Sequence, residues 1–117
     1  NLDAARRRLM DILCNYAGYK RCVPILVFDA YKVRGGTREV EKHHNLYVVY
    51  TQEAETADMY IERTTHELAK DHRTRVVSSD GAEQIIVLGN GALRVSARAF
   101  AEEVAAVEKE IRAFLQN

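Results

Sequence analysis

The feature that most restricts the fold is a short apolar run at residues 23–29, which reads Val-Pro-Ile-Leu-Val-Phe-Asp. No charged side chain occurs in it before the closing Asp29, and several of its members are β-branched. This composition is typical of a strand that is buried on both faces, usually in a parallel sheet. Pro24 is acceptable because it falls among the first residues of the strand. The run therefore favours a sheet whose two faces are both covered.

The spacing of apolar residues predicts the elements around this strand. Residues 2–18 have the periodicity of an amphipathic helix, with Gly18 as its stop. The chain is then expected to continue as strand 23–29, polar loop 33–44, strand 46–51, helix 56–71 and strand 74–80.

The stretch after Asp80 has two interpretations. A helix over 81–88, capped by Asp80, is favoured because Ala82, Glu83 and Gln84 are good helix formers. The alternative is a β-hairpin, since 84–88 is rich in β-formers and Asn90-Gly91 resembles a hairpin turn. In the favoured reading, a short strand follows at 92–95 and Ser96 caps the last helix. The alternation of helices and strands indicates an α/β domain with a mainly parallel sheet.

Composition restricts the number of domains and the cellular compartment that are expected. The 117 residues suit one domain, and no apolar run approaches the ~20 residues that span a membrane, so no membrane partner is expected. Two cysteines are too few for a disulfide framework, which points to a reducing cytoplasm. The net charge is zero, yet residues 1–48 are basic and 49–83 acidic. Such a division suits a phosphodiesterase that pairs carboxylates with cationic side chains.

Acidic residues follow the expected strands. Asp29 ends the first strand, Glu55 and Asp58 come after the second, and Asp80 ends the third. Carboxyl ends of parallel strands meet at one edge of a sheet, so these four carboxylates could converge there. Carboxylate oxygens suit Mg²⁺ or Mn²⁺. On residues alone a second reading stays open, in which they are only helix caps and turn residues.

Local sequence blocks extend the argument. The chain resembles the YacP-like NYN domain family over nearly its whole length, and Glu-Thr-Ala-Asp is its most specific block. The blocks that carry the resemblance are Val-Phe-Asp-Ala-Tyr at 27–31, Tyr-Thr-Gln-Glu-Ala-Glu-Thr-Ala-Asp-Met-Tyr-Ile-Glu at 50–62, Ser-Ser-Asp-Gly-Ala-Glu-Gln at 78–84, and Leu-Gly-Asn-Gly-Ala-Leu-Arg-Val-Ser-Ala-Arg at 88–98.

The resemblance implies a PIN-like, three-layer α/β/α fold and a divalent-metal endoribonuclease. Characterised members are bacterial, associate with ribosomes and cut messenger RNA. Matching blocks would make Glu55, Asp58 and Asp80 catalytic and metal-binding carboxylates, with Asp29 as a further ligand. Thr56 and Ser79 would support them through their hydroxyl groups. The residues implied in RNA contact are Tyr31, Lys32, Arg34, Arg38 and Lys42.

One departure from the family concerns the start of the chain. The family opens with a strand that ends in Asp-Gly-Tyr-Asn, and its aspartate is a central metal ligand. This sequence starts after that strand, so residues 1–117 are expected to form a single, N-terminally truncated domain that lacks its central strand. A rearranged pairing, or strand exchange in a homo-oligomer, would close the sheet.

Two hypotheses from different classes follow. The first is an endoribonuclease, and the second is a non-catalytic PIN-like module that binds RNA or the ribosome. A phosphate-handling enzyme such as a phosphatase is a weaker alternative, because no Gly-rich phosphate loop or nucleophile motif supports it.

Overall fold

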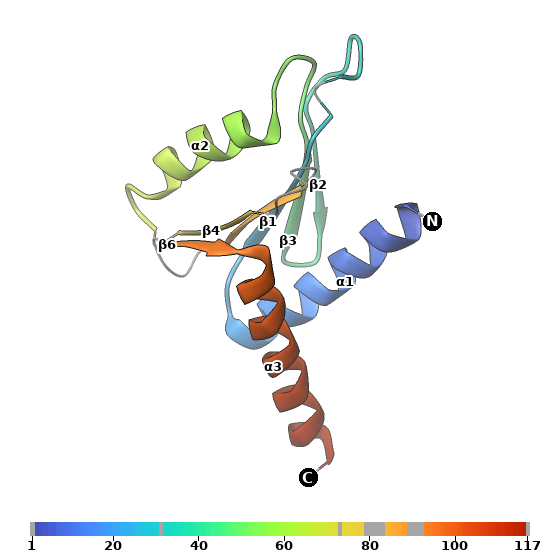
Figure 1. Cartoon of the computed structure of the whole chain (residues 1–117), viewed down its shortest axis with the longest axis vertical. Helices are drawn as coiled ribbons and strands as arrows, with labels where there is room; N and C mark the ends of the chain where they lie inside the picture. Colours follow the sequence, from blue (N-terminus) through green and yellow to red (C-terminus); the bar gives the residue numbers. More distant parts are fainter. Residues whose placement is uncertain (1, 31, 73, 79–83, 89–92, 117) are drawn as a thin grey trace.

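The computed structural model describes residues 2–30, 32–72, 74–78, 84–88 and 93–116 (Figure 1). The predicted helices and strands before residue 78 are present, which confirms the α/β class. In chain order the elements are α1 (Leu2–Lys20), β1 (Pro24–Phe28), β2 (Glu39–His43), β3 (Leu46–Tyr50), α2 (Ala57–Leu68), β4 (Arg75–Ser78), β5 (Gln84–Leu88), β6 (Leu93–Ser96) and α3 (Ala97–Gln116).

The described strands form one sheet in the order β2-β3-β1-β5-β4-β6. β1 pairs in parallel with β3, and β4 with β6. β5 lies between β1 and β4 and is antiparallel to both, while β2 is antiparallel to β3. The prediction of a mainly parallel sheet is therefore wrong, because two of the strands reverse direction and the sheet is mixed.

The favoured helix at 81–88 is also wrong, since Gln84–Leu88 is strand β5. A ladder on each side satisfies its backbone, and this outweighs the helix propensity of Gln84 and its neighbours. The alternative was right about the strand but not about its partner. β5 and β6 both pair with β4, on opposite sides, so they do not form a hairpin with each other.

Part of the predicted loop 33–44 is strand β2, whose five residues are all exposed. Its sequence, Glu-Val-Glu-Lys-His, has the charged character of an edge strand, so no apolar run marks it in the sequence. Earlier in the chain, α1 continues two residues past Gly18 to Lys20. The chain leaves the helix at Arg21, which has a positive φ of 55°.

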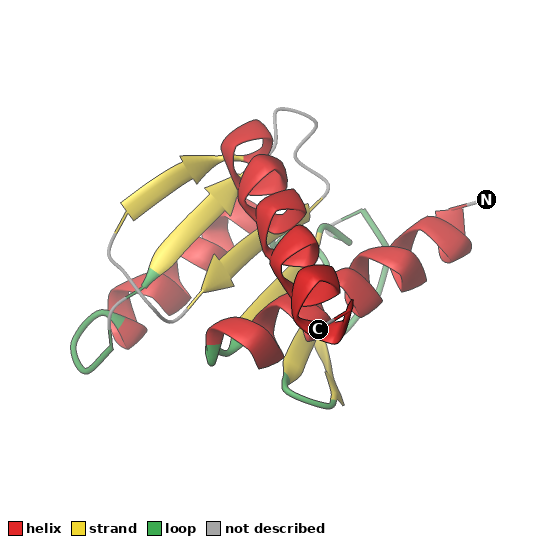
Figure 2. Cartoon of the chain, turned by 90° about the horizontal axis from the view of Figure 1, so that it is seen from below, coloured by secondary structure: helices red, strands yellow, loops and turns green. Residues whose placement is uncertain are grey.

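Helices cover both faces of the sheet (Figures 1 and 2). Residues from α1 and α3 pack on one face against alternate strand residues that include Leu26 and Val48. On the other face, Ala57 and Ile61 of α2 pack against Val27 and Val49. The predicted burial of the 23–29 run on both faces is thus confirmed for Pro24–Phe28, where four of the five residues are buried and Ile25 is partly buried. In the described part of the chain no helix is both long and apolar enough to cross a membrane.

A polar cluster ties α1, β4 and α3 together. The Tyr16 hydroxyl donates to Oε1 of Glu103 at 2.7 Å, and Nη2 of Arg75 donates to the Tyr16 oxygen at 2.9 Å. Arg75 and Glu103 also form an ion pair at 2.9 Å. Burial, reinforced by the hydrogen bond to Glu103, raises the pKa of Tyr16 to about 12. The three side chains therefore join elements that are distant in the sequence.

Candidate functional site

The carboxyl ends of β1 and β3 lie side by side, because the parallel register pairs Phe28 with Tyr50. Thr51, which is 2% exposed, joins the two ends. Its N–H donates to the Phe28 carbonyl at 3.2 Å, and its Oγ1 accepts the Ala30 N–H at 2.9 Å. The backbone at Asp29 is therefore fixed beside the segment that leads into α2.

The loop after β1 is held to this segment by Glu53. Its carboxylate accepts the Gly35 N–H at 2.6 Å, and its own N–H donates to the Gly36 carbonyl at 3.0 Å. Gly35 has a positive φ of 71°, a conformation that glycine adopts without strain. The result is that the cationic residues of the loop, Lys32, Arg34 and Arg38, are tethered beside the predicted carboxylates.

Glu55 is buried between two arginines. Arg38 donates to it through Nε at 3.0 Å and through Nη2, and Arg63 donates through Nη2 at 2.8 Å. These bonds, that from Arg38 foremost, lower the pKa of Glu55 to about 2 against the cost of burial. The side chain of Glu55 is 5% exposed, so it is an ionised carboxylate with both oxygens engaged.

Asp58 and Thr56 occupy the start of α2. Thr56 is the N-cap, and its Oγ1 accepts the Met59 N–H at 3.1 Å. Asp58 lies in the first turn and is exposed, where a negative charge is favoured by the helix dipole. Asp29 is half-buried at the end of β1. The two aspartates thus belong to segments that meet at one edge of the sheet.

Three predicted site residues, Tyr31, Ser79 and Asp80, lie outside the described residues. The strand before Asp80 can be placed. Ser78 pairs with Ile85 and Phe28 pairs with Gln84, so β4 ends at the same edge as β1. β5 separates them, which puts these strand ends about 10 Å apart, or two strand spacings.

The donor chemistry of this edge suits a hard divalent cation, because Asp29 and Asp58 offer carboxylate oxygens. The described residues do not complete such a site. Glu55 is committed to its arginines, and no group of three His, Cys, Asp or Glu side chains within the described ranges is placed to hold one ion. On these residues alone the fit to a metal is incomplete.

The remaining cationic residues are divided between two places. Lys32 and Arg34 are exposed on the loop after β1. Lys42 lies on edge strand β2, with its Nζ 5.5 Å from the centre of the Tyr47 ring. Sequence reasoning missed Arg63, the second partner of Glu55. Glu55 precedes Thr56, the N-cap of α2, so helical spacing gave no signal for this pair.

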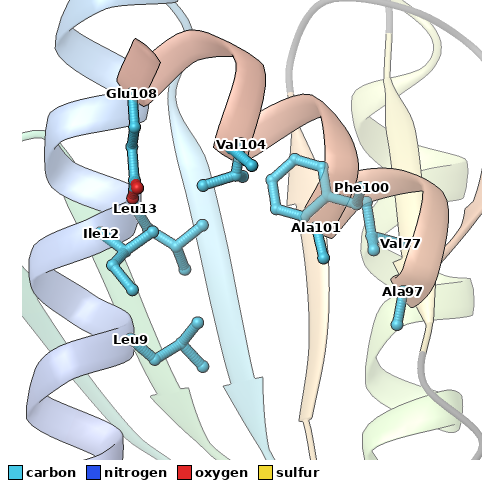
Figure 3. Close-up of a pocket in the computed structure, with 10 residues that line it drawn as sticks. Leu9, Ile12, Leu13, Val77, Ala97, Phe100, Ala101, Val104 and Glu108 are labelled. Carbon is cyan, nitrogen blue, oxygen red and sulfur yellow. The ribbon is translucent and has the colours of Figure 1, made fainter. Parts of the chain in front are cut away.

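A pocket of about 380 Å³ opens elsewhere, between α1 and α3 (Figure 3). None of the predicted site residues lines it. Its walls are apolar apart from one carboxylate, and the lining residues are Leu9, Ile12, Leu13, Val77, Ala97, Phe100, Ala101, Val104, Ala105 and Glu108. This pocket is therefore separate from the candidate site.

Carboxylates and arginines at the carboxyl edge of an α/β sheet are an arrangement suited to phosphodiester chemistry. Comparison with known families gives the particular class. The model of the YacP-like NYN domain matches residues 1–117, and the chain belongs to this family. Membership indicates a nuclease-like, RNA-related function, and NYN and PIN-like nucleases typically use divalent metals.

One curated relative is similar over most of the chain. It is "Uncharacterized protein YacP" of Bacillus subtilis (strain 168), which is 36% identical over 112 residues. The alignment covers 95% of this chain and 65% of the relative, so the chain spans about two thirds of the relative's length. No solved structure matches significantly.

Proposed function

We propose that the protein is a metal-dependent endoribonuclease that hydrolyses phosphodiester bonds of messenger RNA at the ribosome, in the bacterial cytoplasm. The family match over residues 1–117 is the observation that carries this proposal. The placement of Asp29 and Asp58 at adjoining strand and helix ends supports it. A divalent cation bound at this edge would supply activation of water and charge stabilisation at the phosphate.

Asp29, Asp58 and Asp80 are our candidates for the catalytic and metal-binding carboxylates. Glu55 belongs to the same edge but is held by Arg38 and Arg63. The roles of the chain's own residues are then separable. The aspartates would orient a cation and the attacking water, while Thr51 and Thr56 hold the strand end and helix start that carry them.

The test is cleavage of ribosome-bound messenger RNA in Mg²⁺ or Mn²⁺, using residues 1–117 beside the same chain preceded by the expected upstream strand. Asp58→Asn and Asp80→Asn are expected to lose cleavage by at least about 100-fold while the circular dichroism spectrum is kept. Glu67→Gln is the matched control, since Glu67 pairs only at the surface with Lys70. Cleavage by both aspartate variants at the parent rate would disprove the proposal.

A second candidate is a non-catalytic module that binds RNA or the ribosome. It is favoured by the pairing of Glu55 with two arginines, which uses a predicted metal ligand for another purpose. Its signature would be ribosome binding that falls with salt, without cleavage in either metal. Binding that survives Asp58→Asn and Asp80→Asn would agree with it.

A further inference from the structure

Arg38 and Arg63 come from different elements but share one anchor. Arg38 lies on the loop after β1 and Arg63 on the outer part of α2, and both donate to Glu55. Both guanidinium groups also stand over the Tyr60 ring, at 5.3 Å and 5.7 Å from its centre. A buried carboxylate and an aromatic ring thus fix the two cations beside each other.

Arg38, Arg63, Glu55 and Tyr60 form a cluster whose two arginines still have N–H groups and positive charge available to a ligand from solvent. Each guanidinium has five N–H groups, and Glu55 engages two from Arg38 and one from Arg63. The side chain of Arg38 is 32% exposed and that of Arg63 is 57% exposed, whereas that of Glu55 is 5% exposed. One carboxylate also balances only one of the two positive charges. The exposed side of the cluster is therefore the cationic side.

We propose that Arg38 and Arg63 form a phosphate-binding pair that receives the backbone of the RNA substrate. This inference rests on the proposed function for its ligand. Fixed guanidinium groups lose little side-chain entropy on binding, and their planar forks match the oxygens of a phosphate. Glu55 holds the two guanidinium groups in place through its hydrogen bonds, and the face of the Tyr60 ring contacts both cations.

The location fits a substrate that extends to the reacting edge. Arg38 follows the loop held by Glu53, and Arg63 lies between one and two helical turns beyond Asp58. A phosphate bound by the pair would leave the neighbouring nucleotides beside Asp58. RNA would thus be positioned by these two arginines independently of any metal.

Binding should be measured with residues 1–117, using a fluorescent oligouridylate of about 12 nucleotides in EDTA. Arg38→Met and Arg63→Met are each expected to weaken binding about tenfold. Each should also lower the slope of log affinity against log salt by about 0.7, the value for one phosphate on a single strand. A purely structural ion pair would leave that slope unchanged.

Lys70→Met is the matched control, because it removes a positive charge just beyond the C-terminal end of α2, away from Glu55. It should leave the affinity and the salt slope close to those of the parent. Arg38→Lys keeps the charge but loses the fork, so it should keep the slope and lose part of the affinity. If Arg38→Met unfolds, the affinity of Arg38→Lys tests the inference in its place.

Parent-like affinity and slope in both methionine variants, or an equal loss in Lys70→Met, would overturn the inference. Cleavage in Mg²⁺ is scored separately from binding in EDTA. Loss of binding without any cleavage in the parent would therefore reject the nuclease and keep the arginine pair. Cleavage by the parent, with binding unaltered in the methionine variants, would keep the nuclease and reject the arginine pair.

Discussion

Tyr16 and Glu103 stand 87 positions apart in the sequence and meet in a hydrogen bond of 2.7 Å. The bond is part-buried and is shared with Arg75. Tyr16→Phe is expected to lower the free energy of unfolding by about 1–2 kcal/mol, since it leaves partly buried partners without the hydroxyl. Urea denaturation measures this change. Tyr19→Phe is the control, because Tyr19 makes the same kind of bond to Glu110 at an exposed position; equal losses in the two variants would contradict the prediction.

The same hydroxyl predicts a loss of stability at alkaline pH. Tyrosine ordinarily ionises at pH 10, and the pKa of Tyr16 in the folded protein is raised to about 12. The folded state therefore binds this proton more tightly than the unfolded state does, and the stabilisation is complete below pH 10. It is lost as the pH rises toward 12. Unfolding curves between pH 9 and 12 should fall more steeply for the parent than for Tyr16→Phe.

Glu55 predicts a loss of stability at acidic pH. Its pKa falls from 4.5 to about 2 on folding, so the carboxylate stabilises the fold above pH 4.5 and this contribution is lost as the pH falls toward 2. Glu55→Gln should cost about 2–3 kcal/mol at pH 7, after allowing for solvent screening of the exposed Arg63. The difference from the parent should shrink in acid. A gap that stays constant between pH 6 and 3 would refute this assignment.

Thr51 predicts a local effect at the candidate site. Thr51→Val keeps the shape of the buried side chain but leaves the Ala30 N–H without its acceptor, at a cost of about 1–2 kcal/mol. Thr51→Ser keeps the hydroxyl and should cost less. Chemical denaturation of the two variants separates the hydrogen bond from the packing. An equal effect of both would show that the methyl group matters as much as the hydroxyl and would contradict the prediction.

The helix cap at Ser96 offers a prediction away from the site. The Ala99 N–H donates to Oγ of Ser96 at 3.1 Å, at the start of the long helix α3. Ser96→Ala should lower the thermal midpoint, with a loss of about 1 kcal/mol. Ser96→Asp should preserve stability, because aspartate is also a good N-cap. Similar losses in both variants would argue against capping.

Sequence patterns predicted those elements whose local signal agrees with their environment. The 23–29 run was correctly recognised because a strand buried on both faces needs apolar residues throughout. Ser96 was recognised because capping is a local interaction. Strand β5 was ranked below a helix because its state depends on partners at residues 24–28 and 75–78, which no local pattern of 81–88 contains.

In the candidate site, too, one part could be predicted from the sequence and another could not. Strand direction and chain order predicted that Asp29 and Asp58 would share an edge. The fate of Glu55 could not be predicted, since its partners are contributed by a loop residue 17 positions earlier and a helix residue eight positions later. Its spacing matched a metal ligand and an ion-pair partner equally well.

The order of the strands also sets a timescale. The sheet consists of two three-stranded units, β2-β3-β1 and β5-β4-β6, joined by the single ladder between β1 and β5. That ladder pairs Ile25 with Val87, 62 positions later. Closing so long a segment loses more chain entropy than forming either unit alone. Refolding should therefore assemble the two units first, and joining them should determine how fast the native sheet appears.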